Sequence, residues 1–212
     1  MSLRASASDS ISALCRKAPV IPVLVIDDIT TAAPLARALV EGGLPVLEVT
    51  LRTPAALGAI EAMSRVEGAI VGAGTLLNPD DIQRAMDAGA QFGVSPGITE
   101  PMLRFLDGVD LPFLPGAATS SEVMRLLERG YTTQKFFPAE ANGGAKALAS
   151  IGGPIPQVSF CPTGGVSPEN ARDYLDLPNV LCVGGSWVAP KRMVKEKDWA
   201  GITALARAAR TI

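Results

Sequence analysis

Eight short apolar runs, each followed by a segment with helical patterning, constrain the fold of this chain more than any other feature of its sequence. Runs of this length, rich in Val, Ile, Leu and Phe, are typical of strands buried on both faces of a parallel sheet. The segments between them begin with Thr, Pro or Asp, and most end at Gly, as helices do. The predicted strands span residues 20–26, 46–51, 69–74, 91–95, 112–116, 133–137, 158–162 and 180–185.

This alternation predicts an α/β fold, namely a (β/α)8 TIM barrel with an extra N-terminal helix. That helix is expected over residues 1–18, and the last helix over 198–210. Because no linker or low-complexity tract interrupts the pattern, residues 1–212 are assigned to a single domain. The alternative is a doubly wound open sheet, which usually has fewer strands. A barrel would place the active site at the carboxyl ends of the strands.

The charge balance argues against nucleic acid or an anionic membrane surface as a partner. The formal net charge is -2 and the isoelectric point is near 5.3, whereas such partners require a basic face. No apolar run approaches the roughly 18 residues of a membrane span, and residues 1–17 lack the apolar core of a signal peptide. The 3 cysteines are far apart and lack CxxC spacing, so we expect buried, reduced thiols in a cytoplasmic protein.

The sequence contains no histidine, which removes many kinds of active site. Ser-His-Asp and Cys-His nucleophilic sites and HExxH zinc sites are excluded, so acid–base work must fall to Glu, Asp, Lys, Tyr or Cys. A Walker A loop is excluded as well, because GK[ST] does not occur. The stretch GAGTLLN (72–78) lacks the third glycine of a dinucleotide fingerprint. Thr75 within it is expected to be a polar ligand at the end of the third strand.

Lys135 is unusual because it lies inside the apolar run TQKFF, where an unpaired charge is costly. Alternate residues of a strand share a face, so Glu48, Thr50 and Arg52 point one way, and Lys135 points with Phe137. If both faces point into the barrel, these ionisable groups meet near its top. They would then form either a structural ion pair or a site where apolar surroundings and the guanidinium keep the amine neutral for attack on a carbonyl. A barrel interior is normally apolar, which favours the functional interpretation.

Two glycine pairs end the seventh and eighth predicted strands. Gly164 and Gly165 lie in CPTGGVSPEN, and Gly184 and Gly185 lie in CVGGSW, directly before Ser186. Glycine lets backbone N–H groups approach an anion closely, and the serine adds a hydroxyl donor. Because phosphate binds most often after strands 7 and 8 of such barrels, the two pairs together indicate a phosphate site.

Taken together, six segments resemble the bacterial 2-keto-3-deoxy-6-phosphogluconate (KDPG) aldolases, the family of class I KDPG/KHG aldolases. They cover nearly the whole chain in order and are LEVTLRT (47–53), VGAGTLLNP (71–79), SPGIT (95–99), KFFPAEANGG (135–144), FCPTGGVSPEN (160–170) and CVGGSW (182–187). The resemblance implies a (β/α)8 barrel that forms a homotrimer. It also implies the retro-aldol step of the Entner–Doudoroff pathway, which yields pyruvate and D-glyceraldehyde 3-phosphate from a phosphorylated keto acid without a metal or other cofactor.

The same resemblance implies a role for each matching residue. The catalytic pair would be Lys135, which forms the Schiff base, and Glu48, the general acid/base. The pyruvyl carboxylate would be bound by Arg52 with Thr75. The walls of the pyruvate pocket would be Pro96 and Phe137. Thr163 would contact a substrate hydroxyl. The phosphate would be held by Gly164, Gly165, Gly184, Gly185 and Ser186.

Two segments depart from the family pattern. The loop after the first strand contains Asp27 and Asp28 where some relatives are basic, so it is not assigned to phosphate, and GAATSS (116–121) differs from the loop of close relatives. Relatives that act on the phosphogalactonate epimer or on 4-hydroxy-2-oxoglutarate leave these substrates as alternatives. A phosphosugar isomerase or epimerase with Glu48 as base, and a non-catalytic phospho-ligand binding protein, would use the same phosphate site. Only the lyase requires Lys135 as a nucleophile.

Overall fold

The computed structural model describes residues 3–212 of the chain, with side chains from Asp9 onward. In this part of the chain, strands and helices alternate as the sequence predicts. The strands are β1 (Val20–Leu24), β2 (Val46–Thr50), β3 (Ile70–Gly74), β4 (Gly93–Val94), β5 (Phe113–Leu114), β6 (Gly116–Ala117), β7 (Thr133–Phe136), β8 (Ser159–Pro162) and β9 (Val183–Gly185). The helices are α1 (Leu3–Cys15), α2 (Ala32–Glu41), α3 (Ala56–Ser64), α4 (Pro79–Asp87), α5 (Glu100–Leu106), α6 (Ser120–Glu128), α7 (Gly144–Gly152), α8 (Ala171–Leu175), α9 (Lys191–Glu196) and α10 (Trp199–Arg210), with a short 3-10 helix at Ile29–Thr31.

All paired strands run parallel and form two sheets. The larger is a half-barrel of six strands in the order β5-β4-β3-β2-β1-β9, and the smaller has the order β6-β7-β8. Within the larger sheet β1 pairs with both β2 and β9, so the first and last strands of the chain are neighbours. A doubly wound sheet reverses its strand order partway, which this order does not. The α/β class is confirmed, and the doubly wound alternative was wrong.

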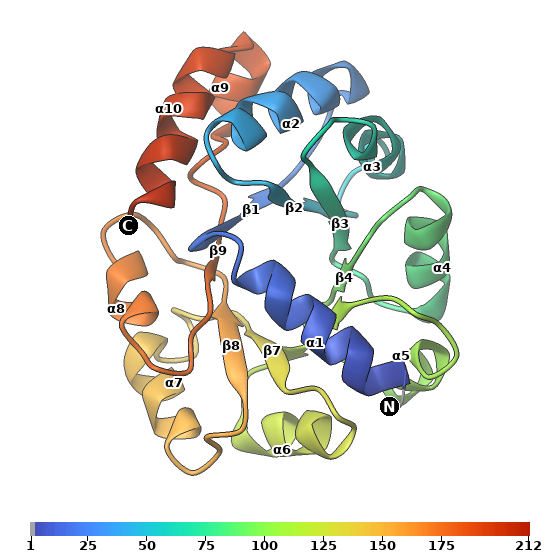
Figure 1. Cartoon of the computed structure of the whole chain (residues 1–212), viewed down its shortest axis with the longest axis vertical. Helices are drawn as coiled ribbons and strands as arrows, with labels where there is room; N and C mark the ends of the chain where they lie inside the picture. Colours follow the sequence, from blue (N-terminus) through green and yellow to red (C-terminus); the bar gives the residue numbers. More distant parts are fainter. Residues whose placement is uncertain (1–2) are drawn as a thin grey trace.

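The two sheets meet at two places, where β8 lies next to β9 and where β6 follows β5 along the chain. Isolated parallel bridges pair Phe160 with Val180 and Thr163 with Gly184, which joins the end of β8 to the segment around β9. Between β5 and β6 stands only Pro115, which has no N–H to give to a sheet ladder. Figure 1 shows the strands around the middle of the molecule, with the helices other than α1 outside them. The single strand predicted over 112–116 is therefore two short strands.

Helix α1 crosses the middle of the molecule rather than joining the outer helices (Figure 1), and it contacts both β5 and β7. Its side chains Ile11 and Cys15 are buried in a separate apolar cluster with residues such as Ile21 and Val46, which stand at the beginnings of β1 and β2. Full burial of a side chain such as Ile11 contributes about 1.5–3 kcal/mol. Because α1 packs against the amino ends of these strands, their carboxyl ends stay accessible.

The three cysteines meet in this same cluster. Cys15, Cys161 and Cys182 are all free and buried, as the sequence predicts. Hydrogen bonds from the Cys182 thiol to the sulfur atoms of Cys15 and Cys161, together with burial, raise the pKa of Cys182 well above its usual range. A thiol that stays protonated is a poor nucleophile, so the cluster contributes packing.

Local signals explain how two of the helices begin. The Asn78 side chain accepts a hydrogen bond from the Asp81 N–H at the start of α4, with Pro79 in the first turn. Thr119 and Glu122 form a reciprocal capping box at the start of α6. The loop GAATSS, which departs from the family pattern, therefore supplies a helix start. Within residues 3–212, none of the helices is long and apolar enough to cross a membrane.

Candidate active site

Lys135 on β7 and Glu48 on β2 meet inside the molecule, as strand alternation predicts. Lys135 Nζ lies 3.2 Å from Glu48 Oε1, and the two side chains are only 6% and 4% exposed. The glycine at position 74 gives the carboxylate its space, because a Cβ there would lie 2.2 Å from Glu48 Oε1. An ion pair this deeply buried must overcome a large desolvation cost, so stability alone is a weak reason for it.

The surroundings of Lys135 differ from those of every other lysine. The other five lysines, at positions 17, 146, 191, 195 and 197, are all exposed, whereas Lys135 is 5% exposed. Its Nζ lies 5.3 Å from the centre of the Phe137 ring, within the range of a cation–π contact. Phe137 thus shares a face with Lys135, as predicted.

Arg52 and Thr75 form a second contact close to the same strands. Arg52 Nε donates a hydrogen bond to Thr75 Oγ1 at 3.3 Å. Thr75 follows β3 and has a φ of 61°, a left-handed conformation that is an outlier for a β-branched residue. Holding it costs on the order of 1–3 kcal/mol, and such strain is concentrated at functional sites. The strained backbone holds the Thr75 hydroxyl beside the guanidinium.

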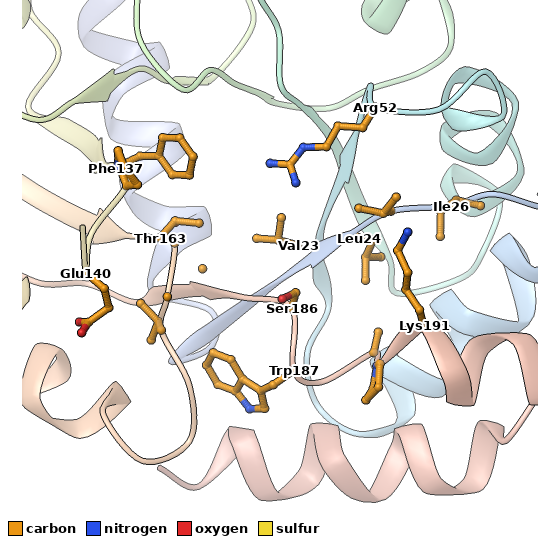
Figure 2. A pocket seen from close by; sticks show the side chains of 18 of the residues that line it. Val23, Leu24, Ile26, Arg52, Phe137, Glu140, Thr163, Ser186, Trp187 and Lys191 are labelled. Carbon is orange, nitrogen blue, oxygen red and sulfur yellow. The ribbon is translucent and has the colours of Figure 1, made fainter. Parts of the chain in front are cut away.

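A cavity of about 780 Å³ opens next to this pair. Seven of the predicted site residues line this cavity. Arg52 and Ser186 lie on opposite parts of its wall (Figure 2). The predicted residues that line it are Arg52, Phe137, Thr163, Gly164, Gly165, Gly184 and Ser186. The cavity therefore joins the predicted carboxylate ligand to the predicted phosphate ligands.

Five of the predicted residues are not in the wall of this cavity. Lys135 and Glu48 form a buried ion pair. Phe137 connects this pair to the cavity, because it lines the cavity and its ring contacts the Lys135 amine. Thr75 is linked to the cavity through Arg52. The other two residues, Pro96 and Gly185, neither line the cavity nor contact it through another predicted residue. Pro96 packs against Gly116, and Gly185 packs against the Trp187 ring.

The glycine pair after β8 is held against the segment that follows Lys135. Gly164 and Gly165 have φ values of 99° and 81°, which only glycine adopts easily. The N–H groups of Ala139 and Glu140 donate to the carbonyls of Thr163 and Gly164, at 2.8 and 3.0 Å. A Cβ on Gly165 would lie 2.6 Å from the Glu140 Cβ. The predicted phosphate loop is thus hydrogen-bonded directly to the segment that follows β7.

Glu140 and Tyr174 are functional candidates that the sequence did not indicate. Glu140 lines the cavity, and the buried hydroxyl of Tyr174 on α8 donates a hydrogen bond to its carboxylate. Burial, and then the hydrogen bond to Glu140, raise the pKa of Tyr174 well above its usual range. The phenol therefore stays neutral and keeps donating to the carboxylate at the pH of a cell.

Replacement of Tyr174 by Phe tests this contact through the pH dependence of stability. The raised pKa of Tyr174 in the folded state means that its contribution is complete below the unfolded pKa of about 10 and is lost as pH rises above it. Guanidinium unfolding at pH 9 and 11 should therefore show a larger loss of stability in the wild type than in Tyr174→Phe. Equal losses in the two proteins would contradict the assignment.

Two further residues, Trp187 and Lys191, line the cavity wall although the sequence did not indicate them as site residues. Lys191 is an exposed residue of the wall, and Trp187 is a half-buried one. Trp187 follows Ser186 in the loop after β9, Lys191 begins α9 at the end of that loop, and Glu140 follows β7. Position beyond the carboxyl end of a strand was the available signal for all three.

Comparisons with known proteins agree with this geometry. A family model described as KDPG and KHG aldolase matches residues 11–205. The chain is 54% identical over 192 residues to the KHG/KDPG aldolase of Escherichia coli K12, a match that covers 90% of each chain.

Two solved structures are similar over nearly their full length. The 2-keto-3-deoxy-6-phosphogluconate aldolase of Zymomonas mobilis ZM4, crystallised with 3-phosphoglycerate, has a TM-score of 0.92 and 51% identity, and the match covers 96% of both chains. The KDPG aldolase of Legionella pneumophila, with pyruvate captured as a covalent carbinolamine intermediate, has a TM-score of 0.92 and 46% identity over 94% of this chain and 98% of that one. Since sequence and fold agree over almost all of the chain, this protein belongs to the KDPG and KHG aldolase family.

Proposed function

We propose that this protein is a class I aldolase that cleaves 2-dehydro-3-deoxy-6-phosphogluconate to pyruvate and D-glyceraldehyde 3-phosphate, a step of the Entner–Doudoroff pathway. The contact between Lys135 Nζ and Glu48 Oε1, buried beside the cavity, is the observation that carries the proposal. A retro-aldol reaction through an imine needs an amine that attacks a ketone and a group that moves protons next to it. The covalent carbinolamine of the Legionella relative supports the same chemistry.

The first steps belong to Lys135. Its neutral amine attacks the C2 ketone of the substrate to give a carbinolamine, and loss of water gives a protonated imine. The imine draws electrons from the C3–C4 bond, so the lysine supplies the electron sink that carbon–carbon cleavage requires. Glu48, 3.2 Å from the amine, takes the proton of the ammonium group before the attack. It then returns this proton to the carbinolamine hydroxyl, which leaves as water, so Glu48 is a carboxylate again before the C3–C4 bond breaks.

Glu48 moves the protons in the later steps. Its carboxylate, directly or through one water, takes the C4 hydroxyl proton as the C3–C4 bond breaks, which releases the aldehyde and leaves an enamine on Lys135. The protonated Glu48 then returns a proton to the enamine carbon, and water hydrolyses the imine to free pyruvate. One carboxylate therefore serves as base and acid in turn.

The remaining residues bind the two ends of the substrate. We assign the pyruvyl carboxylate to Arg52, which the hydroxyl of Thr75 holds in place. Phe137 and Pro96 are assigned to the walls around the pyruvyl group, and Thr163 to a substrate hydroxyl. The phosphate group is assigned to the backbone of Gly164, Gly165, Gly184 and Gly185 and to the backbone and hydroxyl of Ser186.

The isomerase and binding-protein alternatives have less support. Neither requires a buried lysine, and burying the ion pair of Lys135 and Glu48 carries a large desolvation cost. The curated relatives at about half identity are named as aldolases, for KHG and KDPG or for 2-dehydro-3-deoxy-phosphogluconate. Cleavage of 4-hydroxy-2-oxoglutarate as a second substrate is part of the proposal, since it has the same pyruvyl end.

The proposal extends to the architecture and the assembly. We propose that the two sheets form one closed (β/α)8 barrel, since bridges join β8 to β9 and only Pro115 separates β5 from β6. Membership of the family further supports a cytoplasmic homotrimer. Sedimentation at micromolar concentration distinguishes a trimer from a monomer.

Pyruvate release measures the proposed activity directly. Purified protein is mixed with 2-dehydro-3-deoxy-6-phosphogluconate, its galactonate epimer or 4-hydroxy-2-oxoglutarate, and pyruvate is followed with lactate dehydrogenase and NADH. We expect the phosphogluconate to be cleaved with the highest kcat/KM. Consumption of this substrate without pyruvate release, or no reaction with any of the three, would refute the proposal.

A further inference from the structure

Lys191 and Asp27 form an ion pair at the edge of the cavity. Lys191 Nζ lies 3.6 Å from Asp27 Oδ2, and the two side chains are 72% and 69% exposed. Lys191 stands at the start of α9 and lines the cavity together with Ser186, which precedes it in the loop after β9. Asp27 belongs to the loop after β1, so the ion pair links this loop to the start of α9 at the same end of the strands.

Of the charged side chains that line the cavity, Lys191 is the positively charged one on the side of the cavity where Ser186 lies. Three charged side chains line the described cavity, namely Arg52, Glu140 and Lys191. Arg52 is hydrogen-bonded to Thr75, and Figure 2 shows it apart from Ser186, while Lys191 and Glu140 lie to either side of Ser186. An anion beside Ser186 would therefore meet Glu140 on one side, already bonded to Tyr174, and an ammonium group on the other.

We propose that Lys191 binds the phosphate group of the substrate and sets the preference for phosphorylated over unphosphorylated 2-keto acids. This inference rests on the proposed aldolase function. Backbone N–H groups and the Ser186 hydroxyl can orient a phosphate, but they do not neutralise its charge. The ammonium group of Lys191 adds a charge-assisted hydrogen bond, which is about twice as strong as a neutral one.

Asp27 keeps the lysine available without holding it tightly. Exposed ion pairs contribute little, so the amine can turn from Asp27 to a phosphate at small cost. The acidic residues after β1 are thereby explained, since Asp27 directs the cation to the cavity edge instead of binding the substrate. Its neighbour Asp28 caps the 3-10 helix, where hydrogen bonds from Thr30 lower its pKa.

Replacement of Lys191 by Gln separates this role from a merely structural one. The ratio of kcat/KM for 2-dehydro-3-deoxy-6-phosphogluconate to that for 4-hydroxy-2-oxoglutarate should fall about tenfold, as loss of one charged hydrogen bond implies. The fall should come mainly from KM for the phosphorylated substrate, and Lys191→Arg should restore most of it. Lys195→Gln makes the same charge change on α9 away from the cavity wall and should keep the ratio.

Inorganic phosphate provides a second measurement. As a competitive inhibitor of 2-dehydro-3-deoxy-6-phosphogluconate cleavage, it should have an inhibition constant about tenfold lower in the wild type than in Lys191→Gln. An unchanged ratio and unchanged inhibition by phosphate would overturn the inference. If the wild type itself cleaves no substrate, the proposed function fails first, and that result is distinct.

Discussion

Replacement of Lys135 by Arg is expected to reduce cleavage of 2-dehydro-3-deoxy-6-phosphogluconate by roughly four orders of magnitude or more, because the guanidinium cannot form the imine. The arginine keeps a positive charge opposite Glu48, so the buried carboxylate retains a partner. The loss should appear in kcat, measured as pyruvate release at saturating substrate.

The matched control for this substitution is Lys146→Arg, at an exposed lysine of α7. It should retain the activity of the wild type. The circular dichroism spectrum and thermal midpoint of Lys135→Arg show whether the fold survives. If Arg is too large for the site, Lys135→Ala combined with Glu48→Gln removes both buried charges and should fold but remain inactive. Near-normal turnover in any folded variant without Lys135 would refute the assignment of Lys135 as the nucleophile.

Replacement of Glu48 by Gln is expected to lower the rate of cleavage about 10²- to 10⁴-fold, the range typical of a lost general acid or base. Gln has nearly the same shape and can still accept a hydrogen bond from the lysine 3.2 Å away. It cannot take the C4 hydroxyl proton or deliver a proton to the enamine carbon.

A second measurement isolates the proton transfer from bond cleavage. Pyruvate bound as an imine exchanges its methyl protons with D2O when a base is present, and NMR records the rate. Glu48→Gln should lose this exchange while borohydride still labels Lys135 on long incubation. Exchange at the wild-type rate would assign the proton transfers to another group. Glu61→Gln, on the exposed side of α3, serves as the control.

The meeting of Lys135 and Glu48 could be predicted because it depends on two simple properties of strands. Side chains alternate along a strand, and parallel strands present their carboxyl ends at one end of the sheet. Those properties placed both groups on inward faces, and the structure confirms the contact. The glycines after β8 were equally predictable in position, since their positive φ angles require that residue type.

Features that depend on loops or on long-range packing could not be predicted in the same way. No periodicity directs the side chains of Glu140, Trp187 and Lys191, so their approach to the cavity follows from how loops pack after folding. Cys15 joins the interior thiols only because α1 crosses the strands. Pro115 divides a strand by removing one backbone donor, a local effect that an apolar run of residues conceals.

The central claim is that Lys135 forms a covalent imine with the pyruvyl group, and reductive trapping tests it most directly. The protein is incubated with pyruvate, reduced with borohydride, digested and mapped by mass spectrometry. The account predicts a reduced pyruvate adduct on the peptide that contains Lys135, absent when pyruvate is omitted and absent in Lys135→Arg. No adduct, or an adduct on one of the five exposed lysines in place of Lys135, would contradict it.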